Sequence, residues 1–215
     1  MDSFSRVVGA SSSGWGTADV GGAWLHRFNG GADAATSASA DGARGRLTVT
    51  TTTGLRTLVS SVGPTVTDSD LKVTGRADRT AGAYLMLLAR VAEANRFYAA
   101  QLSLNSNTFS IRKNVSNVWT TLPVGAPVVV PAALAADTDY TIRFQVQGTS
   151  LRAKWWPAGQ PEPSAWAVQA TDATFAAGQS GVAGVVVSTQ TTVTFTFDDF
   201  VAAPLVGGVT GTPKV

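Results

Sequence analysis

Carboxyl groups are the first side chains to test for chemistry, because a glycoside hydrolase needs two of them about 5–10 Å apart across the bond that it breaks. Of the 14 acidic residues only two are glutamates, Glu93 and Glu162. Glu93 falls in an expected turn, and Glu162 lies between two prolines in an expected loop. Nothing in the sequence therefore pairs them as an acid and a nucleophile.

Aspartate and histidine offer no better catalytic set. Asp68 and Asp70, like Asp137 and Asp139, are two positions apart, but both pairs lie at expected strand starts, where aspartate is an ordinary turn residue. A Ser-His-Asp triad would have to use His26, the one histidine, and no Gly-x-Ser-x-Gly motif accompanies it. The chain has no cysteine, which excludes a thiol nucleophile and thiolate zinc sites. We expect no catalytic residue and a protein that is not an enzyme.

Calcium is the better metal to test, because it takes six to eight oxygen ligands from carboxylates, carbonyls and water. Asp198 and Asp199 are adjacent in the last expected strand, so they send one carboxylate to each face. Asp2 can lie beside them, because chain termini are often neighbours in space. These three residues are the candidate ligands of a structural calcium, and we expect no other cofactor. The alternative is that Asp2 caps a turn, while Asp198 and Asp199 pair with Arg6 or another surface arginine.

Aromatic and polar side chains on one sheet face are typical of a sugar site, because a sugar ring has an apolar face and a polar edge. Alternation in Leu151–Trp156 and Tyr140–Gln147 turns five candidates outward together, and the region 83–122 adds three more. The candidate glycan-binding residues are Trp156, Arg152, Lys154, Arg143, Gln145, Tyr98, Arg90 and Trp119. The alternative is an ordinary solvated face on which the loop 157–163 covers Trp156.

The elements that must position these residues are short strands. The 215 residues are 44% hydrophobic and 14% charged, which is enough apolar material for a core and too little charge for a disordered chain. Alternating segments recur at short spacing, and four of them predict an antiparallel meander over Asp70–Ala77, Ala83–Val91, Arg96–Leu104 and Thr108–Val115.

The fold class that follows is all-β, an antiparallel two-sheet jelly-roll sandwich. We expect one domain over residues 1–203 and an extended tail over 204–215. Two small barrels are the alternative, but no linker-like stretch divides the chain. Gly63-Pro64 is expected to end a strand, because proline donates no ladder hydrogen bond.

Four pieces of the sequence resemble the concanavalin A-like lectin/glucanase superfamily, laminin-G-like jelly rolls included. They are residues 137–166, with Trp155-Trp156 and Trp166; the opening Asp2–Arg6 with Gly14-Trp15-Gly16; Phe97–Leu102; and Val193–Phe200. The resemblance implies a concanavalin A-like fold over residues 2–201. This fold hosts lectins, glycosidases, lyases and structural modules, so it does not by itself define a function. Domains of this style are similar to ones in actinobacterial extracellular proteins and in bacteriophage tail or virion proteins.

Charge and hydropathy limit the kinds of partner that the protein can bind. The net charge is +2 and no basic cluster stands out, so we expect no nucleic-acid binding. No run of about 18 apolar residues occurs, so we expect no membrane insertion. The first six residues have no apolar segment of a signal peptide, which favours the phage interpretation over secretion.

We therefore expect a non-enzymatic surface or tail module, located in a virion, that attaches to host-surface glycan or builds the particle. Its partners would be other virion or tail subunits, further copies of itself as a homo-oligomer, or a cell-surface glycan. The alternatives are an extracellular carbohydrate-binding module of a polysaccharide-active enzyme, or a glycoside hydrolase or lyase.

Overall fold

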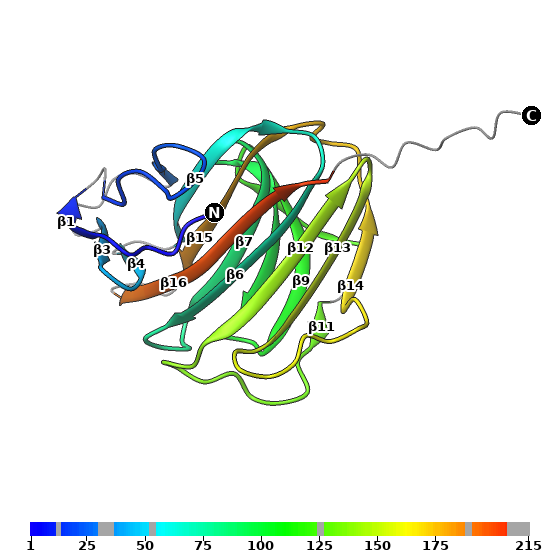
Figure 1. Ribbon diagram of the computed structural model, residues 1–215. Coiled ribbons are helices and arrows are strands. Elements are labelled where there is room, and N and C mark those ends of the chain that lie inside the picture. The colour runs from blue at the N-terminus through cyan, green and yellow to red at the C-terminus, as the bar shows by residue number, and fades with distance from the viewer. Residues whose placement is uncertain (12–13, 30–36, 52–54, 124–126, 188–190, 206–215) are drawn as a thin grey trace, which may run out of the picture.

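Two antiparallel sheets stack face to face (Figure 1). The computed structural model describes residues 1–11, 14–29, 37–51, 55–123, 127–187 and 191–205. This part of the chain forms sixteen strands and no helix, and hence no helix able to cross a membrane. The expected all-β, two-sheet jelly-roll sandwich is confirmed.

The sheet that contains the first and last strands is called the terminal sheet here. Its order is β1-β3-β4-β16-β6-β12-β13-β14, and β16, β6, β12 and β13 run side by side in the front layer of Figure 1. The strands are β1 (Val7–Ser11), β3 (Ser37–Asp41), β4 (Gly45–Thr51), β16 (Thr191–Pro204), β6 (Ser69–Ala77), β12 (Tyr140–Gln147), β13 (Ser150–Pro157) and β14 (Val168–Thr171).

The second sheet is called the meander sheet, because β7, β8, β9 and β10 are consecutive hairpin partners in it. Its order is β10-β9-β8-β7-β15-β5-β2, and β11 also pairs with β9. The strands are β10 (Val118–Leu122), β9 (Thr108–Val115), β8 (Arg96–Ser103), β7 (Ala83–Glu93), β15 (Gly178–Val186), β5 (Arg56–Val66), β2 (Leu25–Asn29) and β11 (Val128–Val129).

Two details differ from the sequence-based expectation. The meander starts at β7 and ends at β10, whereas the sequence predicted that it would start with β6. Strand β6 lies in the terminal sheet between β16 and β12, so the chain crosses between the layers at residues 78–82. Strand β5 also continues through Gly63-Pro64 to Val66. Strand β2 pairs with β5 only as far as Ser61, so Pro64 lies at an edge without a partner on that side, where proline is tolerated.

The main core lies between the sheets and is filled by the inward rows of both. From the terminal sheet come Leu71, Val73, Ile142, Phe144, Val146, Leu151, Phe195 and Phe197, and from the meander sheet Leu58, Leu85, Leu87, Tyr98, Leu102, Phe109 and Ile111. Gly184 of β15 admits the Phe195 ring from the facing sheet, because a Cβ there would lie 2.3 Å from Phe195 Cδ2.

An aromatic cluster closes the corner where the chain begins. The rings of Phe4, Trp15, Trp24, Phe197 and Phe200 contact one another at centroid distances of 4.9–5.9 Å, mostly edge to face. Residue 2 pairs with Phe200 of β16 through two backbone hydrogen bonds. The first residues are thereby joined to the last strand.

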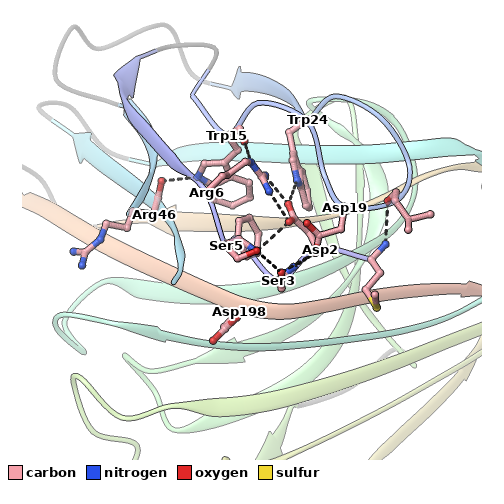
Figure 2. A network of polar contacts seen from close by, with 12 residues as sticks. Asp2, Ser3, Ser5, Arg6, Trp15, Asp19, Trp24, Arg46 and Asp198 are labelled. Atoms are coloured by element: carbon pink, nitrogen blue, oxygen red, sulfur yellow. Dashed lines mark hydrogen bonds and ion pairs between the residues drawn. The ribbon is translucent and has the colours of Figure 1, made fainter. Parts of the chain in front are cut away.

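Asp2 lies at the centre of this corner with no exposed surface (Figure 2). Its carboxylate accepts two hydrogen bonds of 2.7 Å from the Arg6 guanidinium and one of 2.6 Å from Trp24 Nε1. The backbone N–H of Phe4 donates a fourth, at 3.0 Å. A buried carboxylate is stable only when its oxygens are satisfied in this way.

The far end of β16 is Pro204. The tail that the sequence predicts over 204–215 lies, from residue 206 on, outside the described residues.

Replacing Asp2 with asparagine measures how much this carboxylate stabilises the fold. Asp2→Asn keeps the side-chain size but leaves Arg6 without its counter-charge, and breaking a buried pair costs about 3–5 kcal/mol. Arg6 keeps 22% of its side chain exposed, so we expect the free energy of unfolding to fall by about 2–3 kcal/mol in urea denaturation. The control is Arg79→Gln, since the Arg79–Asp78 pair is exposed and 3.8 Å long, and its loss costs less than about 0.5 kcal/mol. Equal losses in the two variants would contradict the role given to Asp2.

His26 makes the same corner sensitive to acid. Its Nδ1 lies 2.8 Å from Ser60 Oγ, its Nε2 is buried without a partner, and burial lowers the pKa of the ring to about 4. An unfolded histidine titrates near pH 6.5, so between about pH 6.5 and 4 the unfolded chain binds a proton that the folded chain refuses. We expect stability to fall by about 2 kcal/mol as the pH drops through this window. His26→Gln removes this part of the slope, which urea denaturation of both proteins at pH 7.5, 6 and 5 measures. An unchanged slope in the variant would contradict the expectation.

Candidate functional site

Five of the predicted glycan-binding residues share the outer face of the terminal sheet, as the alternation predicted. In the β12–β13 pair, Arg143 lies opposite Lys154 and Gln145 opposite Arg152, with Trp156 two positions beyond Lys154. Lys154 and Gln145 are buried, however, and Trp156 keeps only 8% of its surface exposed. The face is therefore assembled as expected but is largely covered.

Carboxylates pair with two of the cations of this face. Arg143 donates to both oxygens of Asp70 at 2.8 and 2.6 Å, and it also pairs with Glu162 at 2.6 Å. Lys154 pairs with the same Glu162 at 2.6 Å and donates to the Pro163 carbonyl at 2.7 Å. Burial alone would raise the pKa of Asp70, but the hydrogen bond and charge of Arg143 lower it below its usual value. Glu162 responds in the same way to Lys154 and Arg143, with a lowered pKa.

Trp166 lies above these cations. The charged groups of Arg143, Arg152 and Lys154 lie 5.7, 4.8 and 4.7 Å from its ring centroid. Cation–π contacts of this length hold the aromatic side chain of the 158–167 loop against the sheet. The network thus satisfies its own charges and presents few free hydrogen-bonding groups to a ligand.

Two further candidates are not on a surface at all. Tyr98 has no exposed area, because its position in β8 faces the core; its hydroxyl donates to Asp172 and accepts from Phe175 N, and burial followed by the Asp172 bond raises its pKa to about 12. Arg90 is 4% exposed and donates to the carbonyls of Phe175 and Gly148, among others. It lies where the ladders of β7 to both neighbours shift register, as at a β-bulge, and its side chain is buried.

The residues predicted to bind calcium do not fit that ion. The two carboxylate oxygens of Asp2 already accept four hydrogen bonds from Phe4, Arg6 and Trp24. Figure 2 shows Asp198 pointing away from that network. Burial raises the pKa of Asp198, whose Oδ1 accepts the backbone N–H of Asp199. Among the described residues no three acidic or histidine side chains form a group able to hold a metal ion.

The outer face of the meander sheet contains a hollow of about 140 Å³ that is lined by aromatic, polar and aliphatic side chains. The lining residues are Leu55, Tyr84, Met86, Gln101, Arg112, Trp119, Val185 and Val187. Of the eight predicted glycan-binding residues, only Trp119 lies here.

A diagonal row across the strands forms this hollow. It runs through Trp119 of β10, Arg112 of β9, Gln101 of β8, Tyr84 of β7 and Val187 after β15. Neighbouring members of the row are not directly opposite each other in the ladder. Trp119, for example, lies opposite Asn114, and Arg112 is two positions from Asn114; the same offset of two recurs at each step of the row. Such diagonal neighbours lie roughly 7–8 Å apart, which long side chains can bridge.

A tight hairpin positions Trp119. Strands β9 and β10 are joined by Ser116-Asn117, and both residues have positive φ (51° and 73°), as a two-residue type I′ turn requires. The Trp119 ring packs edge to face on Phe97 at 5.6 Å, and the Arg112 guanidinium lies 5.3 Å from its centroid.

Polar groups in and beside the hollow have no partner within the described part of the chain. Gln101 is 5% exposed, lines the hollow and makes no side-chain hydrogen bond. The Arg112 side chain makes no hydrogen bond or ion pair with any described residue, and its Nε is buried. Thr57 Oγ1 and Asn114 Nδ2, which face the same side, are also buried and unpaired. Buried polar groups are almost always satisfied, so such a concentration calls for an explanation by a ligand or ordered water.

The floor beneath these groups is apolar. A second hydrophobic cluster lies on the outer side of the meander sheet and comprises Val59, Met86, Leu88, Val91, Phe97, Ala99, Ala183 and Val185. A hollow with an apolar floor, an aromatic wall and a few free hydrogen-bonding groups is the usual design of a small-molecule site.

A larger hollow of about 200 Å³ lies near the corner where the chain begins and lacks this design. Met1, Val20, Phe200 and Pro204 are among its lining residues, and serines are the only described lining residues with polar side chains. The hollow on the meander sheet is therefore the candidate functional site.

Sequence reasoning missed Tyr84, Gln101 and Arg112. The signal that could have found some of them is a polar side chain at an outward position in strands that are otherwise apolar on both faces. Gln101 in Phe97–Leu102 is such a position, whereas Arg112 lies among the polar outward residues Ser110 and Asn114 and carries no such signal.

Solved structures show the same fold. The chain is similar to the carbohydrate-binding module CBM66 from Bacillus subtilis (14% identity, 74% of this chain and 85% of that chain, TM-score 0.55). It is similar to the exoplasmic/lumenal domain of VIP36 in a form bound to Ca²⁺ and Man3GlcNAc (12% identity, 85% of this chain and 86% of that chain, TM-score 0.57). A third similar structure is a GH16 protein of Bacteroides ovatus in complex with a product (9% identity, 84% of this chain and 94% of that chain, TM-score 0.55).

No model of a known protein family matches the chain, and no curated protein matches it. At identities of 9–14% the likeness concerns the fold. The chain has the concanavalin A-like jelly-roll fold that its motifs indicate, and its function has to be argued from its own residues.

Calcium gives a direct test of the metal prediction. Because the Asp2 oxygens are already satisfied and Asp198 points elsewhere, we expect 5 mM CaCl₂, roughly the millimolar range of weak extracellular calcium sites, to leave the Tm unchanged relative to EDTA. A calcium-dependent rise of several degrees that Asp198→Asn abolishes would restore the predicted site.

Proposed function

We propose that the chain is a carbohydrate-binding module that binds a sugar in the hollow of the meander sheet and does not cleave it. The observation that carries this proposal is the diagonal row itself, in which an aromatic side chain, Trp119, lies next to the unpartnered polar groups of Gln101 and Arg112. A sugar needs both kinds of contact, since its ring has an apolar face and its hydroxyls both donate and accept.

The free groups match the edge of a sugar ring. The Gln101 amide offers a donor and an acceptor, the Tyr84 hydroxyl offers both, and the Arg112 guanidinium offers donors only. Met86 and Val185 provide an apolar surface below them. A bound sugar would satisfy groups that otherwise bear the cost of burial without a partner, about 1–3 kcal/mol each.

Binding without hydrolysis is proposed because no described lining residue of the hollow carries a carboxyl group. Glycoside hydrolysis needs two of them. Glu162 is held by Arg143 and Lys154 on the opposite side of the sandwich, and Glu93 lies at the exposed end of β7.

Two settings suit such a module. The first is a virion, where the module attaches a phage tail or particle surface to host-surface glycan. The second is an extracellular polysaccharide-active enzyme, where the module holds the enzyme on its substrate. The fold that the chain shares with CBM66 and VIP36 supports the carbohydrate-binding role that both settings have in common.

Trp119→Ala tests the site. We expect the wild-type protein to be retained by members of a glycan array, and the variant to bind the best of them at least about tenfold more weakly in calorimetric titration, because a tryptophan in a binding site contributes about 2 kcal/mol or more. The side chain is only partly buried, so the variant should remain folded.

Trp166→Ala, on the outer face of the terminal sheet, separates the two candidate faces. Loss of binding in this variant with full binding in Trp119→Ala would move the site to the face that the sequence predicted. Retention of no glycan by the wild-type protein would contradict the proposed function.

A further inference from the structure

The outer face of the meander sheet carries cations without acids. Its outward positions include Arg27 of β2 and Arg112 of β9, and none of the described outward positions of this sheet is aspartate or glutamate. Arg27 donates to Ser61 Oγ at 2.6 Å and lies 3.5 Å from Gln179 Oε1, both neutral groups. The face thus has a net positive charge.

The terminal sheet shows the opposite arrangement. Arg143, Lys154 and Arg46 each pair with a carboxylate at 2.6 Å. The chain therefore pairs several cations of the terminal sheet with carboxylates, whereas Arg27 and Arg112 on the outer face of the meander sheet have no carboxylate partner among the described residues.

Arg112 is the clearest case of an uncompensated charge. Burial lowers its pKa, with Tyr84 as the only opposing influence, yet a guanidinium remains charged at neutral pH. A partly buried cation without a counter-ion destabilises the folded state, unless an anion from outside completes the site.

We infer that the ligand of this hollow is an acidic saccharide, whose anionic group pairs with Arg112 while a sugar ring contacts Trp119 and Gln101. This inference rests on the proposed function and adds the ligand's charge to it. The anion is a carboxylate, as in uronic and sialic acids, or a sulfate ester; both are planar or forked acceptors that a guanidinium binds through two parallel N–H groups. The terminal N–H groups of Arg112, which have no partner among the described residues, supply these donors, while its Nε is buried.

The experiment compares matched acidic and neutral probes on the full chain. Uronate and sialyl oligosaccharides are presented beside their carboxyl-reduced counterparts, and sulfated oligosaccharides beside their desulfated counterparts. We expect the acidic member of at least one pair to bind at least about tenfold more tightly than its neutral partner, and the preference to weaken as salt is raised.

Three variants assign the preference to Arg112. Arg112→Gln removes the charge and should abolish the preference for the acidic probe, whereas Arg112→Lys keeps the charge but loses the fork and should retain part of it. Lys72→Gln removes one exposed positive charge from the terminal sheet and is the matched control, expected to bind like the wild type. Arg112→Gln should not lower the Tm, because it removes an uncompensated charge; a purely structural arginine would behave in the opposite way.

The outcomes distinguish this inference from the proposed function. If neutral and acidic probes bind equally and Arg112→Gln changes nothing, while Trp119→Ala still abolishes binding, the acidic ligand is overturned and the sugar site remains. If no probe binds, both are overturned. A preference confined to the carboxylate pairs or to the sulfate pairs supports the inference and identifies the anion.

Discussion

The central strands of the meander sheet are apolar on both faces, and the rest of the structure depends on this constraint. One face fills the space between the sheets, and the other forms a second cluster around Met86, Leu88 and Phe97. Gln101 on that outer face lies between Met86 and Ser110 in the ladder and makes no side-chain hydrogen bond with any described residue. A polar group without a hydrogen-bond partner destabilises the folded state more in such surroundings than it would in water. A ligand that supplies the missing hydrogen bond therefore gains more binding free energy there.

The two outer faces solve the same problem differently. On the terminal sheet the 158–167 loop folds back, and Glu162 and Trp166 satisfy the cations of β12 and β13 from within the chain. On the meander sheet, β9 and β10 are joined by the short Ser116-Asn117 turn, and within the described residues no loop brings an acid to Arg112. The long 158–167 loop thus covers the outer face of the terminal sheet, whereas the short turn between β9 and β10 leaves the hollow of the meander sheet open.

Alternation was enough to predict the two sheets, the inward rows and the shared face of Arg143, Gln145, Arg152 and Lys154, because a period of two is a local property. It was not enough to predict which face stays open. That depends on Asp70, which is 73 positions from Arg143, and on a loop whose course no period describes. Arg90 and Tyr98 were candidates by residue type; the structure buries Arg90 at a register shift, and it places Tyr98 at an inward position where its hydroxyl donates to Asp172.

The pairing of Asp2 with Phe200 determines how the domain would respond to force. A pull applied between the first residue and Leu205 meets the two hydrogen bonds of that bridge and the short run of β16 that pairs with β6 up to Pro204. The hollow, built on β7 to β10, lies outside this load path. Under tension between these two ends, the Asp2–Phe200 bridge and the end of β16 would separate first, while the hollow on the meander sheet remains intact.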